Sequence, residues 1–477
     1  MGSALFALML SFATGWAILV CIDPRAHPRQ PGFVLRSSIA GGLGLLASST
    51  IYLACLATNI AQRGWIVSLD LAFLGSLALV ARYRRRSART AQEERPEPPA
   101  PTRTVAFDRV ATLALVAALA VHARVWILKY QDEPMGFWDS FAIWNLKARF
   151  FFLESGEHWR RAFVETIAWS HTDYPLLLPL NVARLWTYAA DSNPIYPAIL
   201  SVLFALLAAS VLFGAIRSVR GGPMAFLAVL ALFATPQFTK QVTWQLADIP
   251  TAFFLAASLA FVLVALRSDE LNASGLVIAG LLAGAAAWTK NEGLLFSVAI
   301  LMSAALSGKN RGGRGMLDRA LPFAGGLAVP LLLIFAVKLG VGGANDLAAD
   351  LSVESLGRLF EFARHRAIVV SFAQTLVLVA GAPLLLILAG LCAWWALSSR
   401  PKPRVRIFPA ALALALQVAG YYLVYLITER DLAWHLATSN LRLFLQLWPS
   451  VLLIIFVGVP AIGSDEDAAG RSETTST

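Results

Sequence analysis

Long apolar segments separated by short polar ones run through almost the whole chain. A helix needs roughly 20 consecutive apolar residues to cross the hydrocarbon core of a bilayer. The segments that approach this length are residues 5–22, 39–57, 65–81, 110–128, 194–216, 223–238, 247–266, 320–340, 368–397, 408–427 and 443–462. The stretch 275–307 is long enough for two helices, with a polar interruption at 290–293. The pattern predicts an all-α polytopic membrane protein with about 13 transmembrane helices.

The composition agrees with this pattern. Of the 477 residues, 58% are hydrophobic and 14% are charged, whereas a soluble protein averages roughly 25% charged residues. The three cysteines, Cys21, Cys55 and Cys392, lie in or at the end of apolar segments. They are too few and too scattered for a disulfide framework or a metal site, so we expect them to pack as small hydrophobic side chains.

The distribution of basic residues predicts the orientation. A formal net charge of +10 is compatible with nucleic-acid binding, but we exclude that class because the basic residues lie in short loops between apolar segments. These loops contain Arg25, Arg29, Arg36, Arg82, Arg84, Arg85, Arg86, Arg89, Arg217, Arg220, Lys309, Arg311, Arg314, Arg319, Arg400, Lys402, Arg404 and Arg406. If all of them are cytoplasmic, the spans alternate without conflict, as the positive-inside rule requires. The N-terminus is then expected outside and the C-terminus in the cytoplasm.

The hydrophobic pattern also divides the chain into regions. Residues 1–81 contain three predicted N-terminal transmembrane helices. Residues 82–109 are basic and then Pro-rich, which predicts a cytoplasmic linker. Residues 110–462 form the main transmembrane region, in which residues 129–193 are one long loop on the external side. The polar tail, residues 463–477, is expected to be disordered and cytoplasmic.

The long external loop contains the first group of candidate residues. Its run 140–152 has no Gly or Pro and predicts a helix along the membrane surface. Asp139 lies at the start of this helix and is either a helix cap or a general base that deprotonates an acceptor. Spacing alone favours the cap, and the nearby Asp132, Glu133 and Lys147 bring the functional interpretation level with it, because ionisable groups that perturb one another gather at active sites. Many aromatic residues lie among them: Phe137, Trp138, Phe141, Trp144, Phe150, Phe151 and Phe152.

Five further candidates have a structural explanation beside the functional one. His171 and Asp173 precede an apolar run and either contact a phosphate or acceptor or are interface residues at a helix start. Asp248 starts a span, where the helix dipole alone favours a carboxylate, although an ionisable residue at the membrane boundary is also a functional candidate. Lys290 and Glu292 interrupt an apolar stretch, which a simple outer turn explains, and a lysine there can also pair with a lipid phosphate.

A polar stripe precedes the last span. It consists of Asp431, His435, Ser439, Arg442 and Gln446, at spacings of three or four residues that place them on one helical face. Polar residues that enter a membrane are costly unless they line a wet cavity. We therefore interpret this stripe as part of a functional site.

These elements together resemble the GT-C superfamily of integral-membrane glycosyltransferases, in particular the protein O-mannosyltransferase and lipid A aminoarabinose transferase group. The resemblance covers roughly residues 110–307. The residues that carry it are Trp138 and Asp139 with the Trp-Asn-Leu-Lys-Ala run at 144–148, the segment 171–180, Ala-Asp-Ile-Pro at 247–250 and Thr-Lys-Asn-Glu-Gly at 289–293. Three spans stand before the linker and a fourth leads into the loop, where that group usually has one span.

The resemblance implies a GT-C-like helix bundle with juxtamembrane helices on the exofacial loop. It implies an inverting glycosyltransferase of the bacterial inner (plasma) membrane that takes its sugar from a polyprenyl-phosphate donor. The acceptor is a lipid, a glycan or a protein. No metal site or cofactor is assigned from the sequence, and a divalent cation stays open.

The resemblance also implies roles for the candidate residues. Asp139 is the expected base, with Asp132 or Glu133 as the alternative, and Lys147, Lys290 and Arg442 are expected to hold the departing phosphate. Asp248 and His435 are expected to orient the acceptor or a cation. His171, Asp173 and Glu292 complete the expected substrate-binding residues.

Two other classes remain as alternatives. A transporter or flippase for a lipid-linked sugar predicts internal repeats and charges at the membrane midplane, whereas the charges of this chain gather at one face. A structural subunit would tolerate the loss of Asp139, Lys147 and Arg442.

Overall fold

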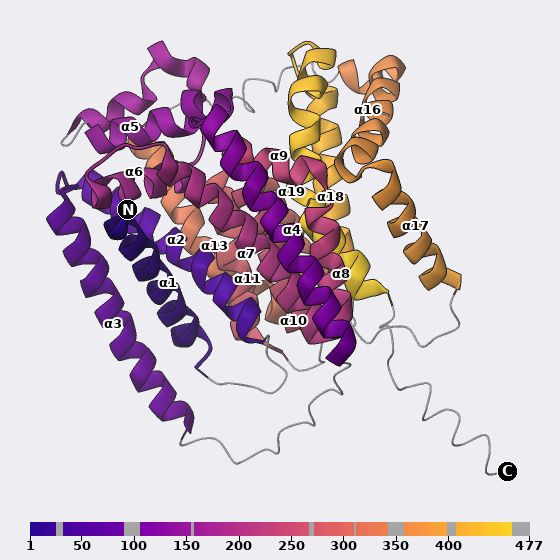
Figure 1. The fold of residues 1–477 in the computed structure, drawn as a ribbon, viewed down its shortest axis with the longest axis horizontal. Coiled ribbons are helices and arrows are strands. Elements are labelled where there is room, and N and C mark those ends of the chain that lie inside the picture. Colours follow the sequence, from indigo (N-terminus) through magenta and orange to yellow (C-terminus); the bar gives the residue numbers. More distant parts are fainter. Residues whose placement is uncertain are drawn as a thin grey trace.

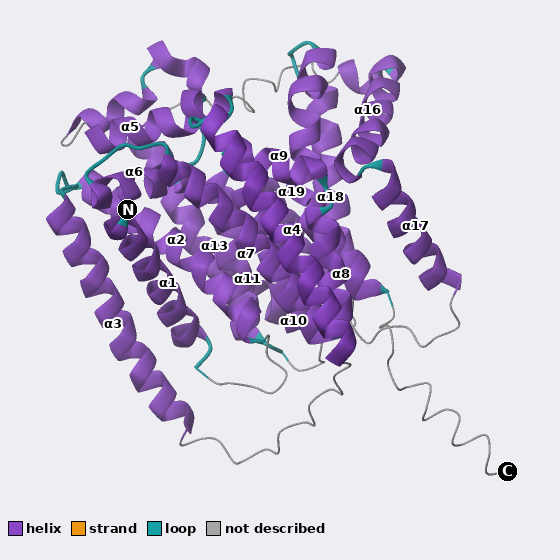
Figure 2. Ribbon diagram, viewed as in Figure 1, coloured by secondary structure: helices purple, strands orange, loops and turns teal. Residues whose placement is uncertain are grey.

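The computed structural model describes residues 1–24, 32–89, 105–153, 157–266, 271–309, 312–341, 357–397 and 407–459. Within these residues every regular element is a helix (Figures 1 and 2). Ten of the described helices are long and apolar enough to cross a membrane, and shorter apolar helices accompany them. The chain is therefore an all-α polytopic membrane protein, as the hydrophobic pattern predicts.

Three helices precede the predicted linker, and a fourth follows it. They are α1 (Gly2–Ile22), α2 (Phe33–Ala57), α3 (Arg63–Arg89) and α4 (Val105–Asp132). The helices extend into both ends of the predicted linker 82–109, whose residues 90–104 lie outside the described part of the chain. The tail 463–477 also lies outside it.

The long loop contains short helices and one buried helix. They are η1 (Ser140–Trp144), α5 (Asn145–Leu153), η2 (Glu157–Phe163), η3 (Glu165–Ser170) and α6 (Leu177–Ala189). The predicted surface helix at 140–152 is present, but its first turn is a π-helix. A buried ion pair joins this region to the N-terminal helices, because Arg184 of α6 donates to Asp70 of α3 at 2.7 Å and 3.0 Å.

The centre of the bundle follows the loop. Its helices are α7 (Ile195–Arg220), α8 (Gly222–Phe233), α9 (Pro236–Trp244), α10 (Asp248–Ala265), α11 (Ala273–Thr289), α12 (Glu292–Leu306) and α13 (Gly312–Val341). Helix α10 is the most deeply enclosed span, with 94% of its apolar window buried, and it packs against α7, α11 and α19. A residue at the start of α10 therefore lies inside protein rather than in lipid.

The C-terminal part is η5 (Arg358–Phe360), α16 (Phe362–Ala380), α17 (Ala382–Leu397), α18 (Phe408–Ile427) and α19 (Leu432–Gly458). Three predicted spans differ from the structure. The segment 368–397 is broken at Gly381, which has φ of +73°, and 223–238 is bent by 62° between α8 and α9. The last helix begins at Leu432, so the stripe that was predicted to lie on one helical face and the predicted span 443–462 belong to one continuous helix.

The polar segments gather at one end of the bundle. In Figure 1, α5, α16 and the start of α19 lie at the upper end, whereas the basic end of α3 lies at the lower end. The loop 129–193 and the stripe at 431–446 are thus brought to the same end of the molecule, although 237 residues lie between them along the chain.

Candidate functional site

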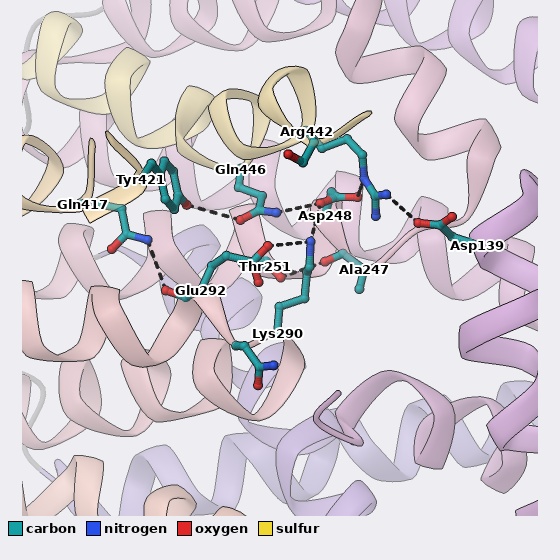
Figure 3. Close-up of polar contacts among 12 residues, drawn as sticks. Asp139, Ala247, Asp248, Thr251, Lys290, Glu292, Gln417, Tyr421, Arg442 and Gln446 are labelled. Atoms are coloured by element: carbon teal, nitrogen blue, oxygen red, sulfur yellow. Dashed lines mark hydrogen bonds and ion pairs between the residues drawn. The ribbon is translucent and has the colours of Figure 1, made fainter. Parts of the chain in front are cut away.

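A buried carboxylate, Asp248, organises the polar end of the bundle. It lies in the first turn of α10 and is completely inaccessible to solvent. Its Oδ1 accepts hydrogen bonds from Lys290 Nζ at 3.0 Å and Gln446 Nε2 at 2.6 Å, and its Oδ2 accepts one from Arg442 Nε at 2.9 Å (Figure 3). A buried charge requires such partners. Asp248 therefore fixes two cations in place, and both of its oxygens are engaged.

The turn between α11 and α12 presents Lys290 to this carboxylate. The turn is tight: a Cβ atom on Gly293 would lie 2.2 Å from the backbone carbon of Ala286, so only glycine fits there. Lys290 is 4% exposed and also pairs with Glu292 Oε1 at 2.8 Å. Burial alone would lower the pKa of Lys290, but Asp248 and Glu292 raise it above its usual value. The turn thus supplies a charged ammonium held between two carboxylates.

Arg442 connects the buried carboxylate to the long loop. Its Nη1 donates to Asp139 Oδ2 at 2.5 Å while its Nε donates to Asp248. The planar guanidinium suits this role because its donors are fixed relative to one another. Asp139 and Arg442 retain 16% and 19% side-chain exposure, whereas Asp248 retains none. The network is therefore closed at Asp248 and open at Asp139.

Asp139 does not cap its helix through its side chain. It occupies the N-cap position of η1 but makes no side-chain capping bond. Its Oδ2 accepts from Arg442, and no hydrogen bond within the described ranges uses Oδ1. One carboxylate oxygen is therefore held in place, while the other is available to a ligand.

The start of the loop is fastened to the end of α9. The backbone N–H of Phe137 donates to the Trp244 carbonyl at 3.2 Å, and the two rings stack with centroids 4.3 Å apart. Gly136 has φ of +71°, and a Cβ there would lie 2.7 Å from the Trp244 oxygen. This close approach sets the position of Asp139 two residues after the contact.

Lys147 lies in a different environment from Lys290. Its side chain is completely buried, and its Nζ donates to the carbonyls of Ser170, at 3.4 Å, and His171. Burial lowers the pKa of Lys147 to about 7, although the Asp173 carboxylate opposes the change. A neutral amine has two N–H groups, which matches the two carbonyl acceptors. Lys147 thus holds the backbone of the loop, where His171 has the left-handed φ of 52°.

This placement predicts a pH dependence of stability. Relative to a Lys147→Met variant, the wild-type protein is expected to gain stability between about pH 7 and pH 10. In this window the unfolded chain still protonates the lysine, with a pKa of about 10.4, while the folded protein keeps it neutral. The measurement is the difference in unfolding midpoint between the two proteins in detergent. Lys129→Met removes an exposed lysine as a control, and a pH-independent difference for Lys147→Met would contradict the assignment.

His171 and Asp173 adjoin the network through the 290–293 turn. Asp173 Oδ2 accepts a hydrogen bond from Asn291 Nδ2 at 2.8 Å. The His171 ring stacks on Tyr174 with centroids 4.5 Å apart, and Tyr174 stacks in turn on Trp144. These contacts join the far end of the long loop to the turn that carries Lys290.

The remaining predicted residues lie elsewhere at this end of the bundle. Asp132 ends α4, is exposed and pairs with Lys129 at 3.8 Å, and Glu133 is exposed beside it. Within the described residues, no hydrogen bond or ion pair joins either of them to Asp248, Arg442 or Lys290. His435 contacts Thr428 at 3.1 Å and the ring of Tyr425.

The structure gives a contact to Gln446, which the predicted stripe contained without an assigned role, and adds Gln417, which the sequence did not indicate. Gln446 completes the shell of Asp248, and Gln417 of α18 donates to the Glu292 carbonyl at 3.1 Å. The spacing of four residues between Arg442 and Gln446 was the available signal for Gln446, because it places both on one helical face. Among the described residues, no group of three or more His, Cys, Asp or Glu side chains is arranged to hold a metal ion.

The fold and the site together define an integral multi-pass membrane protein in which a long loop covers a buried network of ion pairs. A family model described as dolichyl-phosphate-mannose-protein mannosyltransferase matches residues 177–339. This family belongs to the GT-C superfamily, so the expected resemblance is confirmed over 163 of the 477 residues. No curated protein and no solved structure matches the chain. The match supports a membrane glycosyltransferase with a lipid-linked sugar donor.

Proposed function

We propose that the chain is an inverting glycosyltransferase that moves a sugar from a polyprenyl-phosphate donor to an acceptor on the exofacial side of the membrane. The observation that carries the proposal is the Asp139–Arg442–Asp248–Lys290 network. It places an accessible carboxylate next to fixed cations, where acid–base chemistry and phosphate binding are both available. The protein would lie in a bacterial inner (plasma) membrane with its N-terminus outside and its C-terminus in the cytoplasm.

In the proposed reaction, Asp139 is the general base. The acceptor hydroxyl or amine attacks the anomeric carbon, the bond from that carbon to the phosphate oxygen breaks, and the polyprenyl phosphate departs. The acceptor proton moves to Asp139 Oδ1, the oxygen that Arg442 leaves available. A single displacement of this kind inverts the configuration at the anomeric carbon. Because Asp132 and Glu133 lie outside the ion-pair network, Asp139 is favoured over them as the base.

The departing phosphate is proposed to bind at the open edge of the network. Arg442 is partly exposed and supplies positive charge at this edge, and the buried ammonium of Lys290 adds to that charge from beside Asp248. Such charge stabilises a phosphate leaving group. Asp248 orients these two cations, because both of its oxygens are already occupied and it has no exposed surface. Lys147 acts by holding the loop rather than by touching the phosphate, because its Nζ is buried against two carbonyls.

Aromatic side chains beside Asp139 are proposed to contact the sugar or the acceptor. Trp138 and Trp169 are about half exposed, with ring centroids 6.1 Å apart, and Phe141 packs edge-on against Trp138. Exposed aromatic faces next to a carboxylate suit a carbohydrate, whose C–H surfaces stack on rings. The acceptor is a lipid, a glycan or a protein.

The proposal is tested by reconstituting the purified protein in liposomes with a polyprenyl-phosphate sugar and an acceptor fraction. A transferase releases free polyprenyl phosphate and forms a product with inverted anomeric configuration, both of which mass spectrometry and NMR detect. A flippase would move the intact donor across the bilayer without releasing polyprenyl phosphate. Translocation of the intact donor with no release in the presence of acceptors of all three classes would refute the proposal.

Replacing Arg442 by lysine is expected to lower the transfer rate by about 10- to 100-fold. A lysine keeps the charge but lacks the rigid fork that reaches Asp248 and Asp139 together, and a misplaced catalytic group costs rate on this scale. Rates and unfolding midpoints would be measured for Arg442→Lys and for Arg430→Lys, an exposed residue just before the same helix. Equal rates in the two variants would contradict the bridging role of Arg442.

A further inference from the structure

A groove lies between α1 and α3, outside the site described above. Its volume is about 480 Å³. Small and aliphatic side chains from the two helices form its apolar part: Ala13, Ala17, Leu74 and Ala78. Three arginines form its other end: Arg82, Arg85 and Arg86. The groove is therefore amphipathic along its length.

The apolar part of the groove is placed to face lipid. Only 11% of the apolar window of α3 is buried inside the protein, so most of this helix meets the bilayer. From Leu74 to Arg86 the lining of α3 extends for roughly 18 Å at 1.5 Å per residue. One leaflet of hydrocarbon is about 15 Å thick. The groove thus matches the length of one leaflet, with its arginines at the level of the headgroups.

The three arginines that line this end of the groove do not stabilise the fold through polar contacts with the described residues. Arg84 is different, because its Nη1 donates to the Cys21 carbonyl at 2.5 Å and thereby joins the ends of α3 and α1. Arg82, Arg85 and Arg86 are exposed, and no hydrogen bond or ion pair among the described residues engages them. Three positive charges therefore surround the mouth of an apolar groove without a protein partner.

We propose that this groove binds one anionic phospholipid. Its phosphate lies on Arg82, Arg85 and Arg86, and an acyl chain lies along the small side chains between α1 and α3. Guanidinium groups bind phosphate through charge-assisted hydrogen bonds, and basic residues at a membrane surface select anionic over zwitterionic lipids. The lipid fills the gap between the two helices from the bilayer side. This site is independent of the proposed glycosyl transfer.

The test uses the full chain purified in detergent and titrated with phosphatidylglycerol or phosphatidylethanolamine of the same acyl chains, with bound lipid counted by native mass spectrometry. One phosphatidylglycerol is expected to remain bound under activation that removes phosphatidylethanolamine. Arg85→Gln/Arg86→Gln is expected to weaken phosphatidylglycerol binding by about thirty-fold, because each basic residue contributes about 1 kcal/mol and 1.4 kcal/mol corresponds to tenfold. Ala78→Phe, which fills the groove, is expected to lower binding of both lipids.

Matched controls separate the groove from general charge and bulk effects. Lys309→Gln/Arg314→Gln removes two exposed charges elsewhere, and Ala72→Phe adds bulk to α3 outside the groove lining. Both are expected to bind like the wild type. Equal retention of the two lipids by the wild type would overturn the proposal, and this comparison needs no variant. Unchanged phosphatidylglycerol binding in either groove variant, or an equal loss in the controls, would also overturn it.

Discussion

Asp139→Asn is expected to slow sugar transfer by about 10²- to 10⁴-fold, the usual contribution of a positioned general base. Asparagine keeps the size of the side chain and one carbonyl oxygen for Arg442, but its amide cannot take the proton of the acceptor. The fold should persist, because the residue retains 16% side-chain exposure and makes no capping bond. The measurements are the release of polyprenyl phosphate under single-turnover conditions and the unfolding midpoint.

The matched control is Asp132→Asn, which removes a carboxylate from the same loop outside the ion-pair network. It is expected to transfer sugar at the wild-type rate. Undiminished transfer by Asp139→Asn with an intact fold would exclude Asp139 as the base. If Asp132→Asn or Glu133→Gln were the slow variant instead, the base would lie at the end of α4.

Asp248→Asn is expected to lower the free energy of unfolding by about 3–5 kcal/mol, the scale for removing one partner of a buried ion pair. Lys290 and Arg442 would then face each other without the carboxylate that neutralises them both. Transfer should also be lost, because the two cations and Asp139 are held in position through this residue. Chemical unfolding in detergent measures the first effect, and the transfer assay measures the second.

The reason for this loss can be tested separately. Asp248→Asn/Lys290→Met removes one of the stranded cations and should recover part of the stability, since residues in one network do not act additively. Asp23→Asn breaks a pair with Arg36 in which the side chains are 21% and 24% exposed, and it should cost less than about 1 kcal/mol. If Asp248→Asn proved no more destabilising than Asp23→Asn, the network would not be structurally important.

The sequence predicted the features that depend on the consecutive residues of a single segment. The apolar runs predicted the helices, because a backbone in lipid must satisfy its hydrogen bonds within the helix. The interruption at 290–293 was recognised as a turn between two helices, and its Gly293 is the residue that makes the turn tight. A signal at Asp70 was overlooked: an ionisable residue within an apolar span is a candidate for a specific partner, and that partner is Arg184 of α6.

The matched family region shows how far sequence comparison extends into the site. It contains Asp248, Lys290 and Glu292, but it begins after Asp139 and ends before Arg442. Sequence patterns proposed all five residues separately. They did not indicate that Arg442 contacts Asp139 across 303 positions of the chain.

The sequence by itself therefore determined that this is a multi-pass helical membrane protein with its unusual polar residues at one end. Hydrophobicity and helical periodicity are local properties, so they can be read from consecutive residues. Only the tertiary structure decided which polar residues meet. In it, Lys147 donates to a backbone carbonyl of the loop, Asp132 lies outside the network, and Asp248 is enclosed between Lys290 and Arg442. The physical reason is that a buried charge needs partners, and in this bundle they come from helices that are distant in sequence.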